Sequence, residues 1–184
     1  MTFLASETRI GAGEAARIAT LSVEKRGMAF WEQKRTVTRV YEDEIKKVYF
    51  PYFIMNVHYS IRSRLVNKLE NRQIMAMDGL TGEVGVVVGP PVARETAEEG
   101  CRIIRPAFTE DDARKRITDY MSRYFVRTKR AIPEILSDEL FIIYKPAFIV
   151  PLDFEMKNQI RHTRKVIDAE SGYVVYRYDL KDIL

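Results

Sequence analysis

The sequence predicts an α+β fold that is duplicated in tandem, with one helix and one three-stranded antiparallel sheet in each copy. The main observation is an internal repeat, because residues 43–54 align without gaps with residues 138–149. A second match follows in each copy, where residues 78–84 resemble residues 168–174. In both copies, an apolar period typical of a helix precedes a period of two, which is typical of a strand. We therefore expect a first repeat over residues 1–88, a connector over residues 89–106 and a second repeat over residues 107–184.

Each repeat should open with a helix. In the first repeat we expect this helix over residues 13–33, where a weak apolar face recurs. In the second repeat Thr109 is the expected N-cap, and the three acidic residues after it suit the positive end of the helix dipole. Apolar residues recur at helical spacing through residues 113–124, and Pro133 should end the helix. Four cations in the last turns complement its carbonyl end, namely Arg123, Arg127, Lys129 and Arg130.

The repeated strand follows each helix, and one of its two faces is apolar in both copies. The residues of that face are Tyr49, Pro51, Phe53, Met55, Val57 and Tyr59 in the first copy, and Tyr144, Pro146, Phe148, Val150, Leu152 and Phe154 in the second. Side chains alternate between the faces of a strand, so we expect this face to pack against the helix of the same repeat. The opposite face should point outward or toward the other copy. The shared proline has no N–H to donate and predicts a bulge or edge position.

A hairpin turn should come next in each copy. Asp78 and Gly82, and likewise Asp168 and Gly172, fit a turn in which the carboxylate accepts backbone N–H groups and glycine takes a positive φ. Strands are expected on either side of the turn, over residues 74–77 and 82–88 in the first copy and 166–167 and 173–178 in the second. The two aspartates could also form a catalytic carboxylate pair, but turn capping explains both without it. In the connector, a short helical turn around residues 95–101 is one interpretation.

These turns and the helix opening resemble a known family. Residues 77–84 and 167–174, together with residues 109–113, are similar to the corresponding parts of PepSY and related cystatin-like domains. The resemblance implies a helix laid on an antiparallel sheet in each repeat. It also implies a noncatalytic protein, because such domains are usually noncatalytic and sometimes inhibit or assist a peptidase. Such domains often lie outside the cytoplasm.

Composition is compatible with a folded protein in a reducing compartment. Of the 184 residues, 46% are hydrophobic and 30% are charged, which argues against extended disorder. The single Cys101 cannot form an intrachain disulfide. The first residues lack the basic and apolar regions of a signal peptide, and no segment reaches the roughly 18 apolar residues of a membrane span. We expect a cytoplasmic protein without a membrane span, and a native chain that has lost a leader or anchor stays an open alternative.

Residues with the spacing of a catalytic or metal site are absent from the sequence. His58 and His162 are the only histidines, and they are not equivalent in the repeat. No Cys-x-x-Cys or His-x-x-x-His motif occurs, so we expect no metal site and no cofactor. Residues 85–89 lack the Gly-Lys-Ser/Thr ending of a phosphate-binding loop. Nothing near Cys101 or a serine indicates an activated nucleophile, and an enzyme of unknown class is therefore the third interpretation.

Two groups of residues are candidates for binding. The first group is the outward face of the first repeated strand, where the copies differ: Phe50, Tyr52, Asn56 and His58. The second group is a basic segment in each copy: Arg62, Arg64, Lys68 and Arg72 in the first, and Lys157, Arg161, Arg164 and Lys165 in the second. The net charge of +4 permits contact with a polyanion without requiring it. Packing within the molecule is the alternative for the first group, and protection of a strand edge is the alternative for the second.

The leading interpretation is a noncatalytic binding or scaffold protein. It would recognise a protein partner or self-associate as an oligomer through its sheet faces. The alternative is a nucleic-acid-binding accessory protein that uses the paired basic segments.

Overall fold

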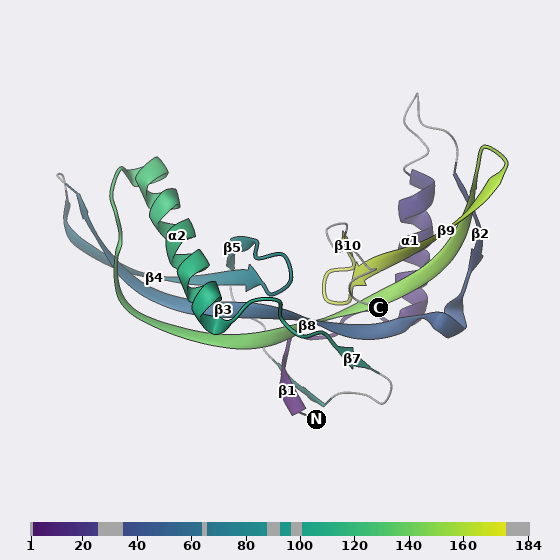
Figure 1. Cartoon of the computed structure of the whole chain (residues 1–184), viewed down its shortest axis with the longest axis horizontal. Helices are drawn as coiled ribbons and strands as arrows, with labels where there is room; N and C mark the ends of the chain where they lie inside the picture. The colour runs from purple at the N-terminus through teal and green to yellow at the C-terminus, as the bar shows by residue number, and fades with distance from the viewer. Residues whose placement is uncertain (1, 26–34, 64–65, 88–92, 97–100, 176–184) are drawn as a thin grey trace. The chain divides into compact units, whose positions relative to one another are not determined.

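The computed structural model describes residues 2–25, 35–63, 66–87, 93–96 and 101–175. These residues form two α-helices, one short 3-10 helix and ten strands that belong to one largely antiparallel sheet (Figure 1). The protein therefore has the α+β character that the sequence predicts. None of the described helices is long and apolar enough to cross a membrane.

The contacts divide the chain into two compact units that alternate along the sequence. Unit 1 contains described residues of Met1–Phe50, Ala93–Ile104 and Lys145–Leu184, and unit 2 contains those of Pro51–Val92 and Arg105–Tyr144. The chain thus passes from one unit to the other four times. The repeats of the sequence run consecutively instead, so the compact units do not follow the repeats.

Unit 2 is a helix packed on the strands of the first copy. Its elements are most of β3 (Lys46–Ser63), β4 (Val66–Asp78), β5 (Val84–Val87), α2 (Glu110–Lys129) and the first part of β8 (Glu134–Met156). Within it, β4 pairs antiparallel with both β3 and β5. Side-chain bonds from β3 to Glu134 and Glu139 place the first part of β8 beside β3.

Unit 1 has the same kind of layering around the second copy. Its helix is α1 (Ala12–Lys25), and β9 (Gln159–Asp168) pairs antiparallel with β8 and with β10 (Val174–Val175). A further strand, β2 (Thr36–Val40), pairs with β8 and is followed by the 3-10 helix Glu42–Glu44. The remaining strands of this unit are β1 (Thr2–Ala5), β6 (Ala93–Thr96) and β7 (Arg102–Ile103).

The two helices are exchanged between the copies. We expected each helix to cover the strands of its own repeat, and this expectation is wrong. Helix α1 packs on β9 and β10 of the second copy and also on β2, which follows it in the chain, and α2 packs on β4 and β5 of the first copy (Figure 1). The period-two pattern shows which face of a strand is buried, but it is so similar in both copies that it cannot show which helix buries it.

The buried face of each repeated strand is the one that the alternation predicts. In unit 2 the core contains Phe53, Met55, Val57 and Tyr59 of β3, Met75 and Met77 of β4, and Ala113, Ile117, Met121 and Phe125 of α2. In unit 1 it contains Ala15, Ala16, Ala19 and Val23 of α1, Phe148, Val150 and Leu152 of β8, and Ile167 and Ala169. The expected apolar face is therefore buried in both copies, although the covering helix is not the expected one. The opposite face is not all exposed, because Ile54 and Ile149 are only 2% and 3% exposed.

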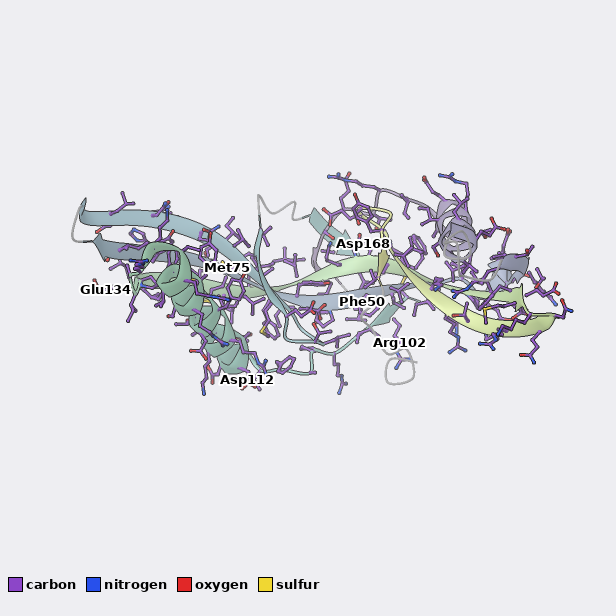
Figure 2. All side chains as sticks on the ribbon, turned by 90° about the horizontal axis from the view of Figure 1, so that it is seen from above. Phe50, Met75, Arg102, Asp112, Glu134 and Asp168 are labelled. Atoms are coloured by element: carbon purple, nitrogen blue, oxygen red, sulfur yellow. The ribbon has the colours of Figure 1, made fainter. Side chains whose placement is uncertain are left out.

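The opening of α2 is also confirmed. The Thr109 hydroxyl accepts a hydrogen bond from the Asp112 N–H at 3.2 Å, and the Asp112 carboxylate accepts one from the Thr109 N–H at 3.2 Å. Hydrogen bonds from the Thr109 side chain and backbone hold the pKa of Asp112 below its ordinary value. Figure 2 shows Asp112 at the first turn of α2. The helix ends at Lys129, earlier than Pro133, and Arg130 takes a left-handed conformation with φ of 50°.

Several strand boundaries differ from the sequence-based expectation. The basic segments are not separate from the strands, because β4 begins at Val66 and β9 begins at Gln159. A two-residue turn at Lys157 and Asn158, with φ of 56° and 57°, joins β8 to β9, as in a type I′ hairpin. In the connector, residues 93–96 form strand β6, so the helical turn expected around residues 95–101 is wrong there. The expected helix end at residues 26–33, the end of the hairpin strand at residue 88, and residues 97–100 lie outside the described part of the chain.

The repeated proline begins the hairpin ladder in each copy. Pairing of β3 with β4 starts at Tyr52 opposite Asp78, and pairing of β8 with β9 starts at Ala147 opposite Asp168. Each proline lies one residue earlier and only accepts, with its carbonyl bonded to the N–H of Gly79 at 2.8 Å or of Ala169 at 3.0 Å. A residue without an N–H loses no bond to the hairpin at this position.

Candidate functional site

A pocket on the outward face of the unit 2 sheet brings together residues from three strands. We call it the sheet-face pocket, and it has a volume of about 550 Å³. Its polar lining comes from Asn56 and His58 of β3, Arg72 and Gln73 of β4, and Asp138 and Glu139 of β8. Asn56 and His58 have the parity opposite to the core residues of β3, which is why they point away from α2. The pocket is within the size range of small-molecule and peptide subsites.

Charges of both signs surround the sheet-face pocket. His58 lies opposite Arg72 in the β3–β4 ladder, and its Nε2 is 3.6 Å from a Glu70 carboxylate oxygen. The Asn56 amide donates to the Glu139 carboxylate at 3.4 Å. The Arg72 side chain is exposed. A guanidinium, a carboxylate, an imidazole and an amide thus line one depression.

Asp138 contributes to this pocket from a different direction. Its carboxylate forms an ion pair with Arg114 of α2, on the helix side of the sheet. The side chain of Asp138 is 20% exposed. Its charge is therefore already engaged, and Glu139 is the carboxylate of β8 that a ligand in the pocket would meet.

The equivalent position in unit 1 holds a closed polar network instead. Asp153 aligns with His58 in the repeat, and its two oxygens accept a hydrogen bond from the Tyr41 hydroxyl at 2.6 Å and bond His162 Nδ1 at 2.8 Å. The Arg39 guanidinium lies 4.5 Å from the centre of the Tyr41 ring. The hydrogen bonds from Tyr41 and His162 lower the pKa of Asp153, and the hydrogen bond to Asp153 raises the pKa of Tyr41. Both oxygens of the carboxylate are occupied, so Asp153 is not placed to act as a general base.

The two turn aspartates have the structural role that the sequence predicts. Asp78 Oδ1 accepts from the N–H groups of Leu80 and Thr81 at 2.9 and 3.1 Å, and Asp168 Oδ1 accepts from those of Glu170 and Ser171 at 2.9 and 3.0 Å. The two turn glycines have almost the same conformation, with φ of 72° at Gly82 and 71° at Gly172. Asp168, labelled in Figure 2, also binds the Lys145 ammonium at 2.9 Å.

The partner-binding candidates divide into two sets. Asn56 and His58 lie together in the sheet-face pocket. Phe50 is only 2% exposed, so it cannot be a contact surface for a partner in this structure, and its role is packing. Tyr52 is half-buried and lies opposite Asp78 at the start of the β3–β4 ladder. The copies therefore differ at these positions for two reasons, since one part of the strand is packed and the other lines a pocket.

The described basic candidates of unit 1 do not lie on one face, and of the four candidates in unit 2 only the side chain of Arg72 is described. Arg72 is exposed in the sheet-face pocket of unit 2, whereas Arg64 and the side chains of Arg62 and Lys68 lie outside the described residues.

In unit 1, Lys157 lies at the β8–β9 turn. Along β9, Arg161 and Lys165 have the parity opposite to that of His162 and Arg164, so strand alternation sends them to different faces. Arg164 lines a second depression of about 400 Å³ with Lys46, Arg102 and Glu44. The paired basic surface stays a prediction.

Sequence reasoning missed three contributors to these sites. Glu139 and Arg39 lie on strands whose partners are distant in sequence, and Tyr41 directly follows the strand of Arg39. Only the strand register shows what these three residues face. The sequence contained one indication of these sites, which is that His58 aligns with Asp153 in the repeat. A histidine aligned with an aspartate marks a position where the two copies have diverged. Among the described residues, no group of three or more His, Cys, Asp or Glu side chains could hold a metal ion.

Comparison of the chain with protein-family models, with curated proteins and with solved structures gave no match.

Proposed function

We propose that the protein is a noncatalytic binding protein that recognises a polypeptide segment of a partner at the sheet-face pocket of unit 2. The observation that carries this proposal is the lining of the pocket by a guanidinium, a carboxylate, an imidazole and an amide, from Arg72, Glu139, His58 and Asn56. Groups of both signs suit a polypeptide, which itself offers charges of both signs and backbone donors and acceptors. A polyanion would meet the Glu139 and Glu70 carboxylates as repulsive charges.

The contrast between the two copies supports a binding role. In unit 1, the equivalent aspartate is bound by Tyr41 and His162 within the same unit. In unit 2, the aligned position is His58, which lines an open depression. The network of unit 1 shows that side chains of the same unit can fill this position. If packing were the only requirement, unit 2 could have kept the same network. Binding explains why unit 2 has an open pocket instead.

The architecture suits such a role as well. We propose that each unit is a copy of a cystatin-like helix-on-sheet module, similar to PepSY domains, in which the helix stabilises one sheet face and leaves the other for contacts. Buried side chains on the helix side of the sheet, including Phe53 and Met55, hold the pocket residues of β3 in place. Sites on strands with packed neighbours are positioned more firmly than sites on loops.

The test begins with a displayed library of random peptides selected on the wild-type protein. Peptides that are enriched should then bind the double variant Arg72→Ala, His58→Ala at least about tenfold more weakly, which corresponds to about 1.4 kcal/mol. The charge reversal Glu139→Lys should weaken binding of peptides that carry a cation and strengthen binding of acidic peptides. Fluorescence polarisation with each labelled peptide measures these affinities.

A matched control is the double variant Asp153→Ala, His162→Ala at the equivalent position of unit 1. It should leave the peptide affinities unchanged, because Asp153 and His162 bind each other. Enrichment of no peptide, or equal binding by the pocket variants and the wild type, would contradict the proposal. Light scattering tests whether a second copy of the chain occupies the pocket instead. A concentration-dependent dimer that dissociates in the variant Arg72→Ala would identify the second copy as the partner.

A further inference from the structure

Unit 2 has another depression, on a different face from the sheet-face pocket and with a different lining. It lies between α2 and the start of β5 and has a volume of about 510 Å³. We call it the helix groove. Its lining contains three arginines and two tyrosines, namely Arg116, Tyr120, Arg123, Tyr124 and Arg127, together with Gly82, Val84 and Thr128. None of the residues in this lining is acidic.

The arginines and Tyr120 form one stripe along α2. Arg116, Tyr120, Arg123 and Arg127 are separated by four, three and four residues, which places them on one side of an α-helix. The stripe lies next to the core face made by Ile117 and Met121, so it flanks the sheet and does not project directly away from it. The rings are available, since Tyr120 is 36% exposed and Tyr124 is 47% exposed.

Two observations show that packing and the helix dipole do not account for Arg116. Arg116 is the seventh residue of α2 and lies against the turn glycine Gly82, and Ile18 is the seventh residue of α1 and lies against the equivalent Gly172. An aliphatic side chain thus packs at this contact in one unit, and an arginine occupies it in the other. Compensation of the helix dipole accounts for cations in the last turn, near Arg127, but not for Arg116 in the first half of the helix.

The groove is also partly preorganised. The Arg116 guanidinium lies 4.6 Å from the centre of the Phe108 ring. A Cβ atom at Gly82 would come within 3.1 Å of an Arg116 nitrogen and 3.0 Å of the Phe108 ring, so the glycine provides the space for this stacking. The Arg123 Nε donates to the Asp119 carbonyl at 3.2 Å. Within the described part of the chain, no carboxylate forms an ion pair with Arg116, Arg123 or Arg127. The exposed acidic residues nearest to the stripe along α2 are Asp119 and Asp112, and the charge of Arg116 adds to the hydrogen bonds from Thr109 in lowering the pKa of Asp112. Glu83 directly follows Gly82, a residue of the lining, in the chain.

From this arrangement we infer that the helix groove binds single-stranded nucleic acid. Guanidinium groups bind phosphates in a bidentate manner, and aromatic rings stack on bases, so alternation of the two is the chemistry that a single strand recognises. An anionic membrane surface is a poorer fit, since interfacial helices insert large apolar side chains and the groove stripe contains none. The site is separate from the sheet-face pocket and does not depend on its proposed function.

The experiment measures binding of a fluorescently labelled single-stranded oligonucleotide of about 12 nucleotides, within the site size of comparable proteins. The variant Arg116→Gln, Arg123→Gln, Arg127→Gln should bind at least about tenfold more weakly. Three lost phosphate contacts should also reduce the slope of log affinity against log salt by about 2. The control variant Lys115→Gln, Lys157→Gln, Arg161→Gln removes the same charge from exposed positions outside the groove and should retain the wild-type affinity.

Stacking is tested separately from charge. The variant Tyr120→Leu, Tyr124→Leu should lose about tenfold in oligonucleotide affinity with an unchanged salt slope, and should bind inorganic polyphosphate as the wild type does. The substituted side chains are exposed, and circular dichroism confirms that each variant is folded. The inference is overturned if the wild type does not bind the oligonucleotide at low salt, or if the arginine variant binds it equally well. It is also overturned if the tyrosine variant is unaffected, or if only phosphatidylserine vesicles are bound.

Discussion

At residue scale, Asp168 combines a turn function with an ion pair. One carboxylate oxygen accepts the N–H groups of Glu170 and Ser171, and the other binds Lys145, which also lies 3.4 Å from the Glu170 carboxylate. Burial of the side chain would raise the pKa of Asp168, but Lys145 and the backbone hydrogen bonds outweigh it and the pKa is lowered. A lowered pKa in the folded state means that ionised Asp168 stabilises the fold.

The substitution Asp168→Asn separates these two functions, because asparagine keeps an oxygen for the turn and loses the charge. We expect a loss of about 1 to 2 kcal/mol in the free energy of unfolding at pH 7, measured by urea denaturation. The wild-type advantage is present above the unfolded-state pKa of about 3.9 and is lost as the pH falls through the lower folded-state pKa. The difference between the two proteins should therefore shrink from pH 5 to pH 2.5. A difference that is constant over this range would show that the charge is not involved.

Local chemistry is the part of the molecule that the sequence predicts best at this scale. The capping by Thr109 and the turns at Asp78 and Asp168 depend on residues at most a few positions apart, so their spacing is sufficient. The network of Asp153 could not be predicted, because Tyr41 is 112 residues away and faces Asp153 only through the β2–β8 register. The same reason hid Glu139 from the prediction of the sheet-face pocket.

At element scale, alternation along β3 and β8 places residues of one parity in the helix-covered core of each unit. Phe53 is fully buried and Phe148 is 7% exposed, each in the core of one unit. We expect Phe53→Ala and Phe148→Ala to cost about 3 to 5 kcal/mol each in the free energy of unfolding. Tyr52→Ala, at a half-buried position of the other face, should cost less. Chemical denaturation of the three variants measures the costs, and equal losses at all three positions would refute the assignment of the two faces.

The pairing of helices with sheets marks the limit of prediction from sequence at this scale. The existence of α1 and α2 and the buried parity of β3 and β8 follow from periodicity. The partner of each helix does not, because the apolar faces of the two strands match position by position and either helix could cover either strand. Side-chain volumes distinguish the cores: α1 contributes small residues such as Ala15 and Ala19, whereas α2 contributes Ile117 and Met121. Periodicity does not include this information on volume.

At the scale of the whole molecule, each unit is assembled from separate stretches of the chain. The core of unit 1 needs α1 together with Phe148, Leu152 and Ile167, and the core of unit 2 needs β3 and β4 together with Ile117 and Met121. Neither half of the sequence therefore contains a complete core. This differs from a tandem protein, in which each repeat would fold alone.

Fragments test this interleaving directly. Fragments 1–104 and 105–184, cut at the boundary between Ile104 and Arg105, should each lack a cooperative unfolding transition when purified alone. An equimolar mixture should regain the circular dichroism and cooperative unfolding of the intact chain, because both cores can then form. A fragment that unfolds cooperatively as a monomer would show that its helix can cover its own strands, and would contradict the exchange of helices.

The position of α1 in the chain has a consequence for synthesis on the ribosome. The helix ends at Lys25, but the strand that completes its core, β9, ends at Asp168. At about 5 to 20 residues per second, the apolar side of α1 waits on the order of ten seconds after it emerges before its partner strands exist. During this interval only β2 and the 3-10 helix after it can cover α1, because the core residues of β8 and β9 belong to the last third of the chain. We expect chaperone depletion in a coupled translation reaction to lower the soluble yield of this protein more than that of a tandem protein of equal length.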